Sequence, residues 1–324
     1  TDNYLLVNHS EMLKTYKSIA GSLPNLKKKQ FQKPTPFINT LSNQNTMVDI
    51  VLIDEAHLLL TKEDTYNNFH QKNQLNEIIT RSKVTILIFD PKQVLKIKSH
   101  WGRNTLQEIV GPFATKMLRL SKQFRMRASQ ETLHWINRFV EREILPLPSD
   151  FNYDFQIFED PEAFKQAIFQ KDQKYGLSRM VSTFDYLHKK DGADYYVDED
   201  GINLPWNRSY SNITWAEQPE TINEIGSIYT IQGFDLNYVG VVLGPSIQYD
   251  EETQKLVIDS THYKDKGAFV SRQDLSKTEN EQAKEDIILN SLNVLMKRGA
   301  KGLYLYATNL QLRKRLLQLK ENDS

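Results

Sequence analysis

Cysteine is missing from all 324 residues of the sequence. Its absence excludes disulfide bonds, thiol catalysis and zinc sites built on cysteine ligands. A chain without disulfides is compatible with a reducing compartment, and we expect a cytoplasmic location. Long hydrophobic runs are missing as well, because no apolar run reaches the roughly 18–20 residues that a membrane-spanning helix needs. We therefore expect no membrane partner.

The sequence also lacks an excess of either charge, with 41 Lys and Arg residues against 41 Asp and Glu residues. A neutral chain carries no overall electrostatic signature of nucleic-acid binding, so such binding would need a local basic face. The hydrophobic share of 39% and the charged share of 25% are typical of a folded globular protein. A length of 324 residues predicts about two domains.

Short aliphatic runs alternate with amphipathic helical patterns along the chain. Several runs are continuously apolar, which favours strands buried on both faces of a parallel sheet. The alternation predicts a doubly wound α/β architecture. The expected strands are Tyr4–Val7, Asp49–Asp54, Val84–Asp90, Met117–Leu120, Arg179–Thr183, Val239–Leu243 and Leu303–Ala307. The expected helices are Ser10–Ile19, Asn67–Arg81, Ser129–Ile144, Pro161–Gln170 and Glu279–Met296.

Three stretches depart from this rhythm. Residues 26–36 are basic and contain proline, so we expect a loop there. Residues 185–225 and 248–277 are polar and hairpin-like, which predicts insertions between core elements. The best domain boundary follows the third strand, so we expect a first lobe over residues 1–115 and a second lobe over residues 116–324.

The most informative stretch is "VDIVLIDEAH", residues 48–57. An apolar strand ends there in two adjacent carboxylates, Asp54 and Glu55, where open α/β sheets bind ligands. The first carboxylate can hold Mg²⁺, and the second can orient or deprotonate an attacking water. A pair of acids that only caps the next helix is the open alternative. No phosphate-binding loop of the form G-x-x-x-x-G-K-[ST] accompanies the pair, since none of the 13 glycines opens that pattern.

Two further stretches carry polar residues that suit phosphate contacts. "DPKQ" follows the next expected strand and offers Asp90 and Gln93, and a glutamine at that position can reach a γ-phosphate. "LSKQFRM", residues 120–126, offers Arg125, whose planar guanidinium suits bidentate contact with phosphate oxygens. A plain Asp-Pro turn and an ordinary surface arginine are the alternatives.

The last two stretches are "IYTIQGFDLNYVGVVLG", residues 228–244, and "NVLMKRGAKGLYLYA", residues 293–307. The first contains a Gln-Gly turn followed by Asp235, and the second delivers Arg298 to a glycine turn before the last strand. Turn chemistry alone can explain either stretch. The order and spacing of all five stretches together are far more specific than any one of them.

Together these stretches make the chain resemble a superfamily 1 helicase core. In detail it resembles the bacterial DUF2075 family of P-loop ATPases, relatives of the helicase-like part of Schlafen proteins. The resemblance runs from "YLLVNHSEMLKTYK" to "RGAKGLYLYATN" and is most specific in "IQGFDLNYVGVVLGP" and "NVLMKRGAKGLYLY". "DPKQ" stands where superfamily 2 typically has Ser-Ala-Thr, which favours superfamily 1 in spite of His57. The resemblance implies two RecA-like P-loop NTPase lobes, the first incomplete, with ATP and Mg²⁺ as cofactors.

The resemblance also implies a role for each motif residue. Asp54 would bind Mg²⁺, Glu55 would be the catalytic carboxylate and Gln93 would sense the γ-phosphate. Arg125 and Arg298 would be arginine fingers from the second lobe. The remaining nucleotide-site residues would be Asp90, Gln232, Gly233 and Asp235, and the nucleic-acid path would pass Asn8, His9 and Thr230.

Three positions depart from the family pattern. The phosphate loop and its lysine are absent, so we expect a chain that is truncated just downstream of them and inactive alone. A degenerate, catalytically dead paralogue is the alternative. Lys297 stands where the family usually has threonine, and Phe89 stands where it often has glycine, which affects only fine tuning.

The resemblance predicts a helicase-like ATPase core whose parent protein couples hydrolysis to binding or moving along DNA or RNA, expected to be single-stranded. A fused or associated nuclease is a further conceivable partner. The rival hypothesis is a non-catalytic scaffold that binds nucleic acid or protein with the same fold. We expect His57 to link the carboxylates to a neighbouring motif. Trp206 and Trp215 are expected in a small satellite core rather than on a base-stacking surface.

Overall fold

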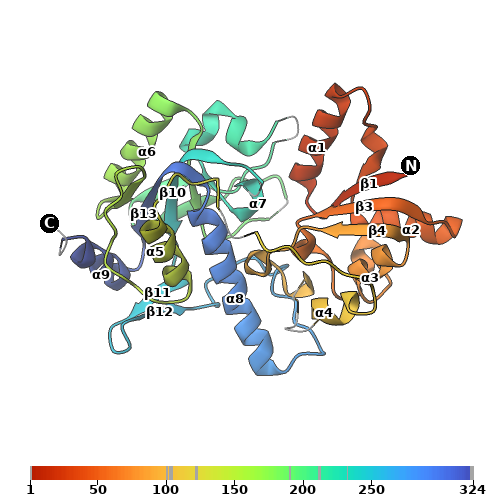
Figure 1. The fold of residues 1–324 in the computed structure, drawn as a ribbon. Helices are drawn as coiled ribbons and strands as arrows, with labels where there is room; N and C mark the ends of the chain where they lie inside the picture. The colour runs from red at the N-terminus through yellow and green to blue at the C-terminus, as the bar shows by residue number, and fades with distance from the viewer. Residues whose placement is uncertain are drawn as a thin grey trace. The chain divides into compact units, whose positions relative to one another are not determined.

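The chain divides into two compact units, and each contains its own parallel sheet (Figure 1). The first unit comprises residues 1–120 and 267–283, and the second comprises residues 121–266 and 284–324. The computed structural model describes residues 2–99, 101, 105–120, 123–189, 191–210, 213–231 and 233–321.

The sheet of the first unit has four parallel strands in the spatial order β2 (Phe31–Gln32), β1 (Asn3–Val7), β3 (Val48–Asp54) and β4 (Ser82–Leu87). Helices α2 (Pro34–Gln44) and α3 (Gln74–Ile79) pack on one face, where Phe37 and Ile78 join Val51 and Ile53 in one hydrophobic core. Helix α1 (Ser10–Ser22) lies over the β2 end of the other face, where Tyr16 stacks on Phe31. A short helix, α4 (Thr105–Val110), completes the unit.

Local chemistry sets the ends of these helices. Helix α1 begins at His9, whose ring nitrogen Nδ1 accepts a hydrogen bond from the Met12 N–H at 3.4 Å. Helix α2 starts with Pro34, which suits the first helical position, and ends at Asn45 in the left-handed region with φ 48°. The side chain of Asn73 caps α3 by accepting from the N–H groups of the second and third helical residues.

The sheet of the second unit has five parallel strands in the order β5 (Asp154–Ile157), β13 (Gly299–Ala307), β10 (Leu236–Leu243), β6 (Ser178–Ser182) and β9 (Ile225–Gly226). Two antiparallel hairpins accompany it, β7 (Tyr196–Glu199) with β8 (Ile202–Pro205) and β11 (Ile247–Asp250) with β12 (Lys255–Ile258). The helices are α5 (Gln130–Val140), α6 (Pro161–Tyr175), α7 (Ile228–Ile231), α9 (Leu310–Glu321) and α8 (Lys277–Met296), whose first residues belong to the first unit.

Helix α6 shows how the second unit achieves close packing. Its first turn is capped by the Asp160 carboxylate, and the helix stops at Gly176, whose φ of 66° favours glycine. The helix lies against Gly240 of β10, where an added Cβ would stand 2.8 Å from atoms of Phe164 and Ile168. The bare glycine therefore lets helix and sheet approach one another.

The structure confirms the α/β class with parallel sheets and with hairpin insertions in the second unit. The strand expected at Met117–Leu120 is wrong, because that segment pairs with no described strand and its apolar side chains are exposed. The loop expected over residues 26–36 is also wrong, since it contains β2 and the start of α2. The helix expected at Asn67–Arg81 is shorter in the structure, where α3 starts after the Asn73 cap because turns form the residues before it.

Part of the second expected insertion, residues 267–277, belongs to the first unit. Residues 267–283 pack with the first unit, where the Ile97 N–H donates to the Ala268 carbonyl at 2.9 Å and the Arg272 guanidinium donates to the Thr61 hydroxyl at 2.7 Å. The two tryptophans of the first insertion lie where expected, since Trp206 and Trp215 are buried. Within the described part of the chain, no helix is both long and apolar enough to cross a membrane.

Candidate functional site in the first unit and arginine cluster in the second

The two adjacent acids of the candidate site lie where β3 ends. Asp54 is the last residue of the strand, and the Glu55 N–H donates to its Oδ1 at 3.0 Å. Glu55 itself has φ 51° and ψ 47°, a left-handed conformation that costs a non-glycine residue roughly 1–2 kcal/mol. Such strain at the end of a buried strand is typical of a functional position, because the neighbouring structure must hold it in place.

The imidazole of His57 lies beside the Glu55 carboxylate. Its Nε2 lies 2.9 Å from Glu55 Oε2, and its Nδ1 accepts a hydrogen bond from the Asp90 N–H at 3.3 Å. Because Nδ1 accepts, a neutral ring carries its proton on Nε2, the nitrogen beside the carboxylate, although the two atoms do not meet in hydrogen-bonding geometry. His57 is buried, so this arrangement is shielded from water. The histidine thus links the acids after β3 to the turn after β4, as its place in the sequence predicted.

The turn after β4 brings Asp90 and Gln93 to the same edge of the sheet. The Ala56 N–H donates to the Ile88 carbonyl at 2.8 Å, and this bond ties the ends of the two strands together. Asp90 accepts from the Lys92 N–H at 2.9 Å and from the Gln93 side-chain amide at 2.8 Å. The amide of Gln93 is therefore already oriented by the carboxylate next to it.

Tyr16 of α1 is a site residue that no sequence motif indicates. Its hydroxyl donates a hydrogen bond to Asp54 Oδ2. Burial, and then the hydrogen bond to Asp54, raise the pKa of the Tyr16 phenol well above its usual value, so the phenol keeps its proton. The two residues are 38 positions apart in the sequence and meet only through the packing of α1 on the sheet.

Two residues expected near the nucleic-acid path make structural contacts. The side-chain amide of Asn8 donates to the Leu58 carbonyl at 2.8 Å, so it braces the turn after the two acids. Trp101 is not one of these expected residues, but its indole donates to the His57 carbonyl at 3.2 Å and braces the same turn. His9 caps α1. The contacts of Asn8 and Trp101 position the turn after the two acids. A direct role of Asn8 and His9 in nucleic-acid binding is a proposal.

The predicted residues of the second lobe form a separate cluster in the second unit. Arg125 pairs with Asp235, and both side chains are partly exposed. Arg298 is buried, and its Nη1 donates to the Phe234 carbonyl at 3.3 Å. Gly233 lies in this turn with φ 84°, a conformation that favours glycine.

Thr230 lies in α7, just before that turn. Its hydroxyl accepts from the Ser227 N–H at 2.9 Å and so caps the short helix. Gln232 lies outside the described residues. The structure therefore sorts the remaining predicted residues into two groups, acids and an amide in the first unit and two arginines with Asp235 in the second.

The acids fit part of a magnesium site. Mg²⁺ is usually bound by one or two carboxylates together with substrate phosphates and water, so Asp54 suits it as a protein ligand. Asp54 Oδ2 would have to exchange its tyrosine hydrogen bond for such a contact. In the described ranges no group of three or more His, Asp or Glu side chains could hold a metal by itself. Mg²⁺ bound at Asp54 would therefore need phosphate oxygens or water as its further ligands.

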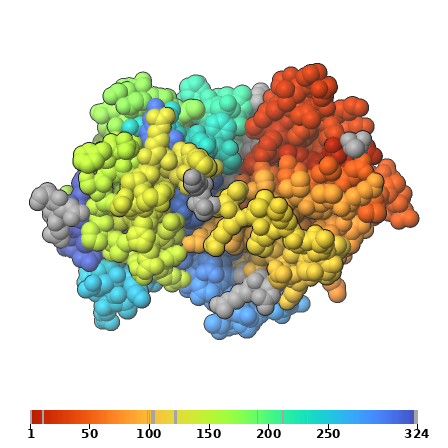
Figure 2. Space-filling view, in the orientation of Figure 1, coloured from red at the N-terminus to blue at the C-terminus, as the bar shows by residue number. Residues whose placement is uncertain are grey.

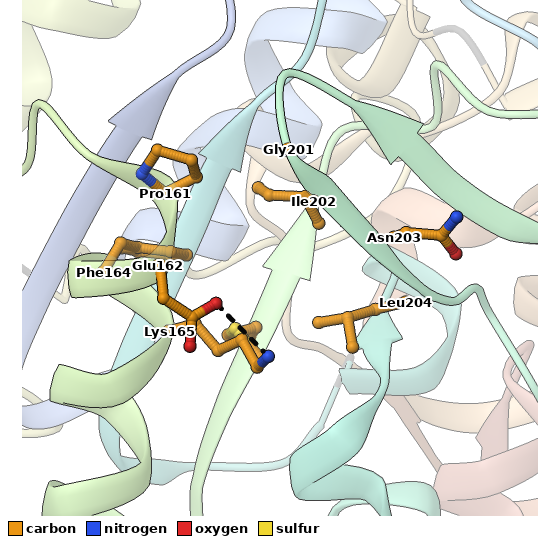
Figure 3. Close-up of a pocket in the computed structure, with 9 residues that line it drawn as sticks. Pro161, Glu162, Phe164, Lys165, Gly201, Ile202, Asn203 and Leu204 are labelled. Carbon is orange, nitrogen blue, oxygen red and sulfur yellow. Dashed lines mark hydrogen bonds and ion pairs between the residues drawn. The ribbon is translucent and has the colours of Figure 1, made fainter.

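The cavity in Figure 3 is a separate feature of the second unit. It measures about 130 Å³ and lies between the first turns of α6 and the hairpin β7–β8. Pro161, Ile202 and Leu204 line it, and the Glu162 carboxylate pairs with the Lys165 ammonium at 3.4 Å beside it. None of the predicted site residues lines this cavity.

Comparisons with known proteins agree with these motifs. Residues 1–309 match the family described as Schlafen group 3, DNA/RNA helicase domain. The protein YPL245W of Saccharomyces cerevisiae is 40% identical over 343 residues, a match that covers 98% of this chain and 75% of the yeast protein. The matched family is thus the Schlafen branch of the resemblance, and a similar protein exists in a yeast.

A solved helicase structure, arterivirus nonstructural protein 10, also aligns with the chain. The alignment has a TM-score of 0.31 and 10% identity, and it covers 98% of this chain and 62% of the viral chain. A TM-score of this size supports no conclusion about the fold.

Proposed function

Because the chain belongs to the family of Schlafen group 3 DNA/RNA helicase domains, we propose that it forms the core of an ATPase that works on nucleic acid. In the parent protein, ATP hydrolysis would be coupled to binding or moving along single-stranded DNA or RNA. The observation that carries this proposal is the set Glu55, His57, Asp90 and Gln93, which the ends of β3 and β4 hold together.

Each residue of this set has a defined task in phosphoryl transfer to water. Glu55 accepts a proton from the attacking water, and the His57 ring 2.9 Å away limits where its carboxylate can lie. Gln93, oriented by Asp90, contacts the γ-phosphate. Mg²⁺ bound through Asp54 would neutralise charge on the phosphate oxygens when the nucleotide is present. Positioning and charge stabilisation suffice for this reaction, so no covalent nucleophile is required.

Arg125 and Arg298 are proposed as the cations that stabilise the transferring phosphate. In the structure, Arg125 pairs with Asp235 and Arg298 donates to the Phe234 carbonyl. Both would exchange these contacts for phosphate oxygens. Since the two contacts lie in the same turn, a rearrangement of residues 233–235 would change both contacts together.

Nucleic-acid binding needs a local basic face in a neutral chain, and the second unit contains a candidate. The ammonium of Lys301 lies 4.5 Å from the ring centre of Tyr175, and that of Lys171 lies 4.6 Å from the ring centre of Tyr238. A hydrogen bond from Lys174 lowers the pKa of Tyr175. Among the described residues, no carboxylate pairs with Lys174 or Lys301, so both charges are open to phosphate groups.

Two observations favour a non-catalytic scaffold as the second candidate. The Tyr16 hydroxyl donates a hydrogen bond to the Asp54 carboxylate, and these 324 residues contain no phosphate-binding loop. We propose that the loop is carried by further sequence of the parent protein and that the chain is inactive alone. A fused or associated nuclease as the partner of the ATPase is a further proposal.

The test is ATP hydrolysis by the parent protein with its natural upstream sequence, with and without single-stranded DNA or RNA. Glu55→Gln keeps the size of the side chain but removes the base, so turnover should fall by about 10²–10⁴-fold while nucleotide binding persists. Glu63→Gln is the matched control, because Glu63 is an exposed residue of the same loop and should leave turnover unchanged. No turnover with any nucleic acid would favour the scaffold.

A further inference from the structure

One stretch of the first unit contains lysines but no acidic residue. From residue 12 to residue 48 the sequence has six lysines and neither Asp nor Glu, although basic and acidic residues number 41 each over the whole chain. A neutral chain with such a stretch carries a local positive field, which attracts polyanions. The lysines are Lys14, Lys17, Lys27, Lys28, Lys29 and Lys33.

Helix α1 presents two of these lysines on the side away from the sheet. Lys14, Lys17 and Gly21 follow one another at intervals of three and four residues, so they lie on one stripe of the helix. The opposite stripe contains the buried Ala20 and Tyr16, whose ring stacks on β2. The lysine stripe is therefore exposed, and the outer surface of α1 belongs to the red part of Figure 2.

A lysine from the next turn reaches the same stripe because Gly21 has no side chain. A Cβ at Gly21 would stand 2.7 Å from Cε and 3.3 Å from Nζ of Lys28. The ammonium group of Lys28 thus lies on α1, at the end of the lysine stripe. Lys27 and Lys29 flank it and are exposed. We call the surface formed by Lys14, Lys17 and residues 27–29 the α1 face.

The turn that carries the last three lysines is fixed to the sheet. The side chain of Gln30 accepts from the Lys27 N–H at 2.9 Å and donates to the Asn3 carbonyl of β1 at 3.1 Å. Phe31, the next residue, is buried in β2. The backbone of residues 27–29 is therefore in place before any ligand binds, and in the described part of the chain none of these lysines pairs with a carboxylate.

The α1 face offers charge but no ring on which a base can stack. Surfaces that bind single strands combine basic residues with aromatic side chains that stack on the bases. Tyr16, the one aromatic residue in the sequence of α1, is turned to the sheet and donates to Asp54. The exposed apolar side chains near the lysines are aliphatic, at Ile19, Leu23 and Leu26. Such a face suits a phosphate backbone whose bases are already paired.

We propose that the α1 face binds the phosphate backbone of double-stranded nucleic acid. The inference rests on the proposed function, since it requires a protein that works on nucleic acid, and it adds a duplex to the single strand proposed there. A duplex carries one negative charge per about 1.7 Å of its axis, so ammonium groups alone can hold it. Phosphate contacts carry no sequence information, so binding should not depend on base sequence.

Fluorescence anisotropy of the 324-residue chain tests the proposal with a labelled DNA duplex, the matching RNA duplex and a poly(dT) strand of the same length. The double substitution Lys17→Glu/Lys28→Glu should weaken binding of at least one duplex by more than about tenfold and reduce its salt slope by about 2, because each lysine on a phosphate contributes about 0.9. Binding of poly(dT) should change by less than about twofold. A chain that binds neither duplex at low salt would overturn the proposal.

The control for net charge is Lys72→Glu/Lys116→Glu. Both lysines are exposed residues of the first unit outside the α1 face, and the double substitution changes the charge by the same amount. It should leave duplex affinity within about threefold of the unaltered chain. An equal loss from both double substitutions would show that only the net charge matters, and the α1 face would then be no binding site.

Gly21→Glu and Gly21→Gln form a second test that keeps every lysine in place. Both side chains enter the lysine stripe and displace only the flexible end of Lys28. The glutamate adds a carboxylate that repels phosphate groups, so duplex binding should be at least about fivefold weaker for Gly21→Glu than for Gly21→Gln. Equal affinities would show that phosphates do not approach α1, which would contradict the proposal.

The outcomes separate this inference from the proposed function. Duplex binding that requires the α1 face, in a protein whose parent hydrolyses no ATP, keeps the inference and removes the function. ATP hydrolysis by the parent, with duplex binding that does not depend on the α1 face, removes the inference alone. If Lys17→Glu/Lys28→Glu weakens binding only to poly(dT), or only to vesicles that contain phosphatidylserine, the partner is a single strand or a membrane surface and the proposal is wrong.

Discussion

The two sheets of this protein are built from similar sequences but are covered very differently. "VTILIF", residues 84–89, is about as apolar as "VGVVLG", residues 239–244. Every residue of β6 is buried, and β10 has a single half-buried position. In β4, by contrast, three of the six residues are exposed. An apolar run therefore identifies a strand but does not reveal how many neighbours it has.

The neighbours account for the difference. β10 lies between β13 and β6 and carries α6 on Gly240, whereas β4 has one strand neighbour among the described residues. The candidate acids thus stand at the end of the less covered sheet, and the candidate arginines stand in the unit whose central strands are buried. Equivalent substitutions in the two sheets should consequently have unequal effects on stability.

The largest expected contrast comes from removing aliphatic side chains. Leu305 of β13 is fully buried, so Leu305→Ala should cost about 2–5 kcal/mol of unfolding free energy. Ile86→Ala, at a half-exposed position of β4, should cost less than about 1 kcal/mol. Hydrogen exchange in urea, read peptide by peptide, separates the two units. Equal losses would show that the open face is covered in solution.

Substitutions to larger side chains should also affect the stability of the two sheets unequally. Gly240→Ala places a methyl group 2.8 Å from Phe164 Cζ and Ile168 Cγ1, so we expect a loss of about 1–3 kcal/mol. Ile86→Phe adds more volume on an uncovered face and should change stability by no more than about 0.5 kcal/mol.

The control for crowding is a double substitution. Ile168→Val removes a methyl group facing Gly240, so it should recover part of the loss in the Gly240→Ala background. If the losses of unfolding free energy measured in urea are additive, crowding between α6 and β10 does not explain the cost of Gly240→Ala.

Much of the fold could be predicted from the sequence, because buried strands are continuous apolar runs. The runs at residues 49–54 and 239–243 both form strands, and Asp54 and Glu55 stand at a strand end as expected. Neighbouring parallel strands end at one edge, which is why the sequence alone could place Gln93 near these acids.

The rest depended on packing between distant segments. Nothing near Asp54 in the sequence indicates that Tyr16 donates to it, and the "KRG" turn does not show that Arg298 is buried against Phe234. The segment at residues 117–120 has strand composition but forms no strand, because strand formation needs a partner backbone as well as suitable side chains.

The smallest expected contrast concerns one carboxylate on each sheet. Burial alone would raise the pKa of Asp154, but hydrogen bonds from Lys171, Tyr304 and Gln156 hold it below its ordinary value of 3.8. The pKa of Asp49 on β3 is lowered too, chiefly by the hydrogen bond from Lys83, at an exposed position. A lowered folded-state pKa stabilises the protein above the ordinary value, and this stabilisation is lost as the pH falls through the folded pKa.

Asp154→Asn should therefore cost about 1 kcal/mol near neutral pH, and the cost should shrink below about pH 4. Asp49→Asn should follow the same direction with a smaller change, and the change should vanish at high salt because its ion pair is exposed to solvent. Urea midpoints at low and neutral pH, each at low and high salt, measure both. The opposite result would be a stability change that depends on salt for Asp154→Asn and does not for Asp49→Asn. It would show that the second unit's sheet, not the first unit's, is the more exposed to solvent.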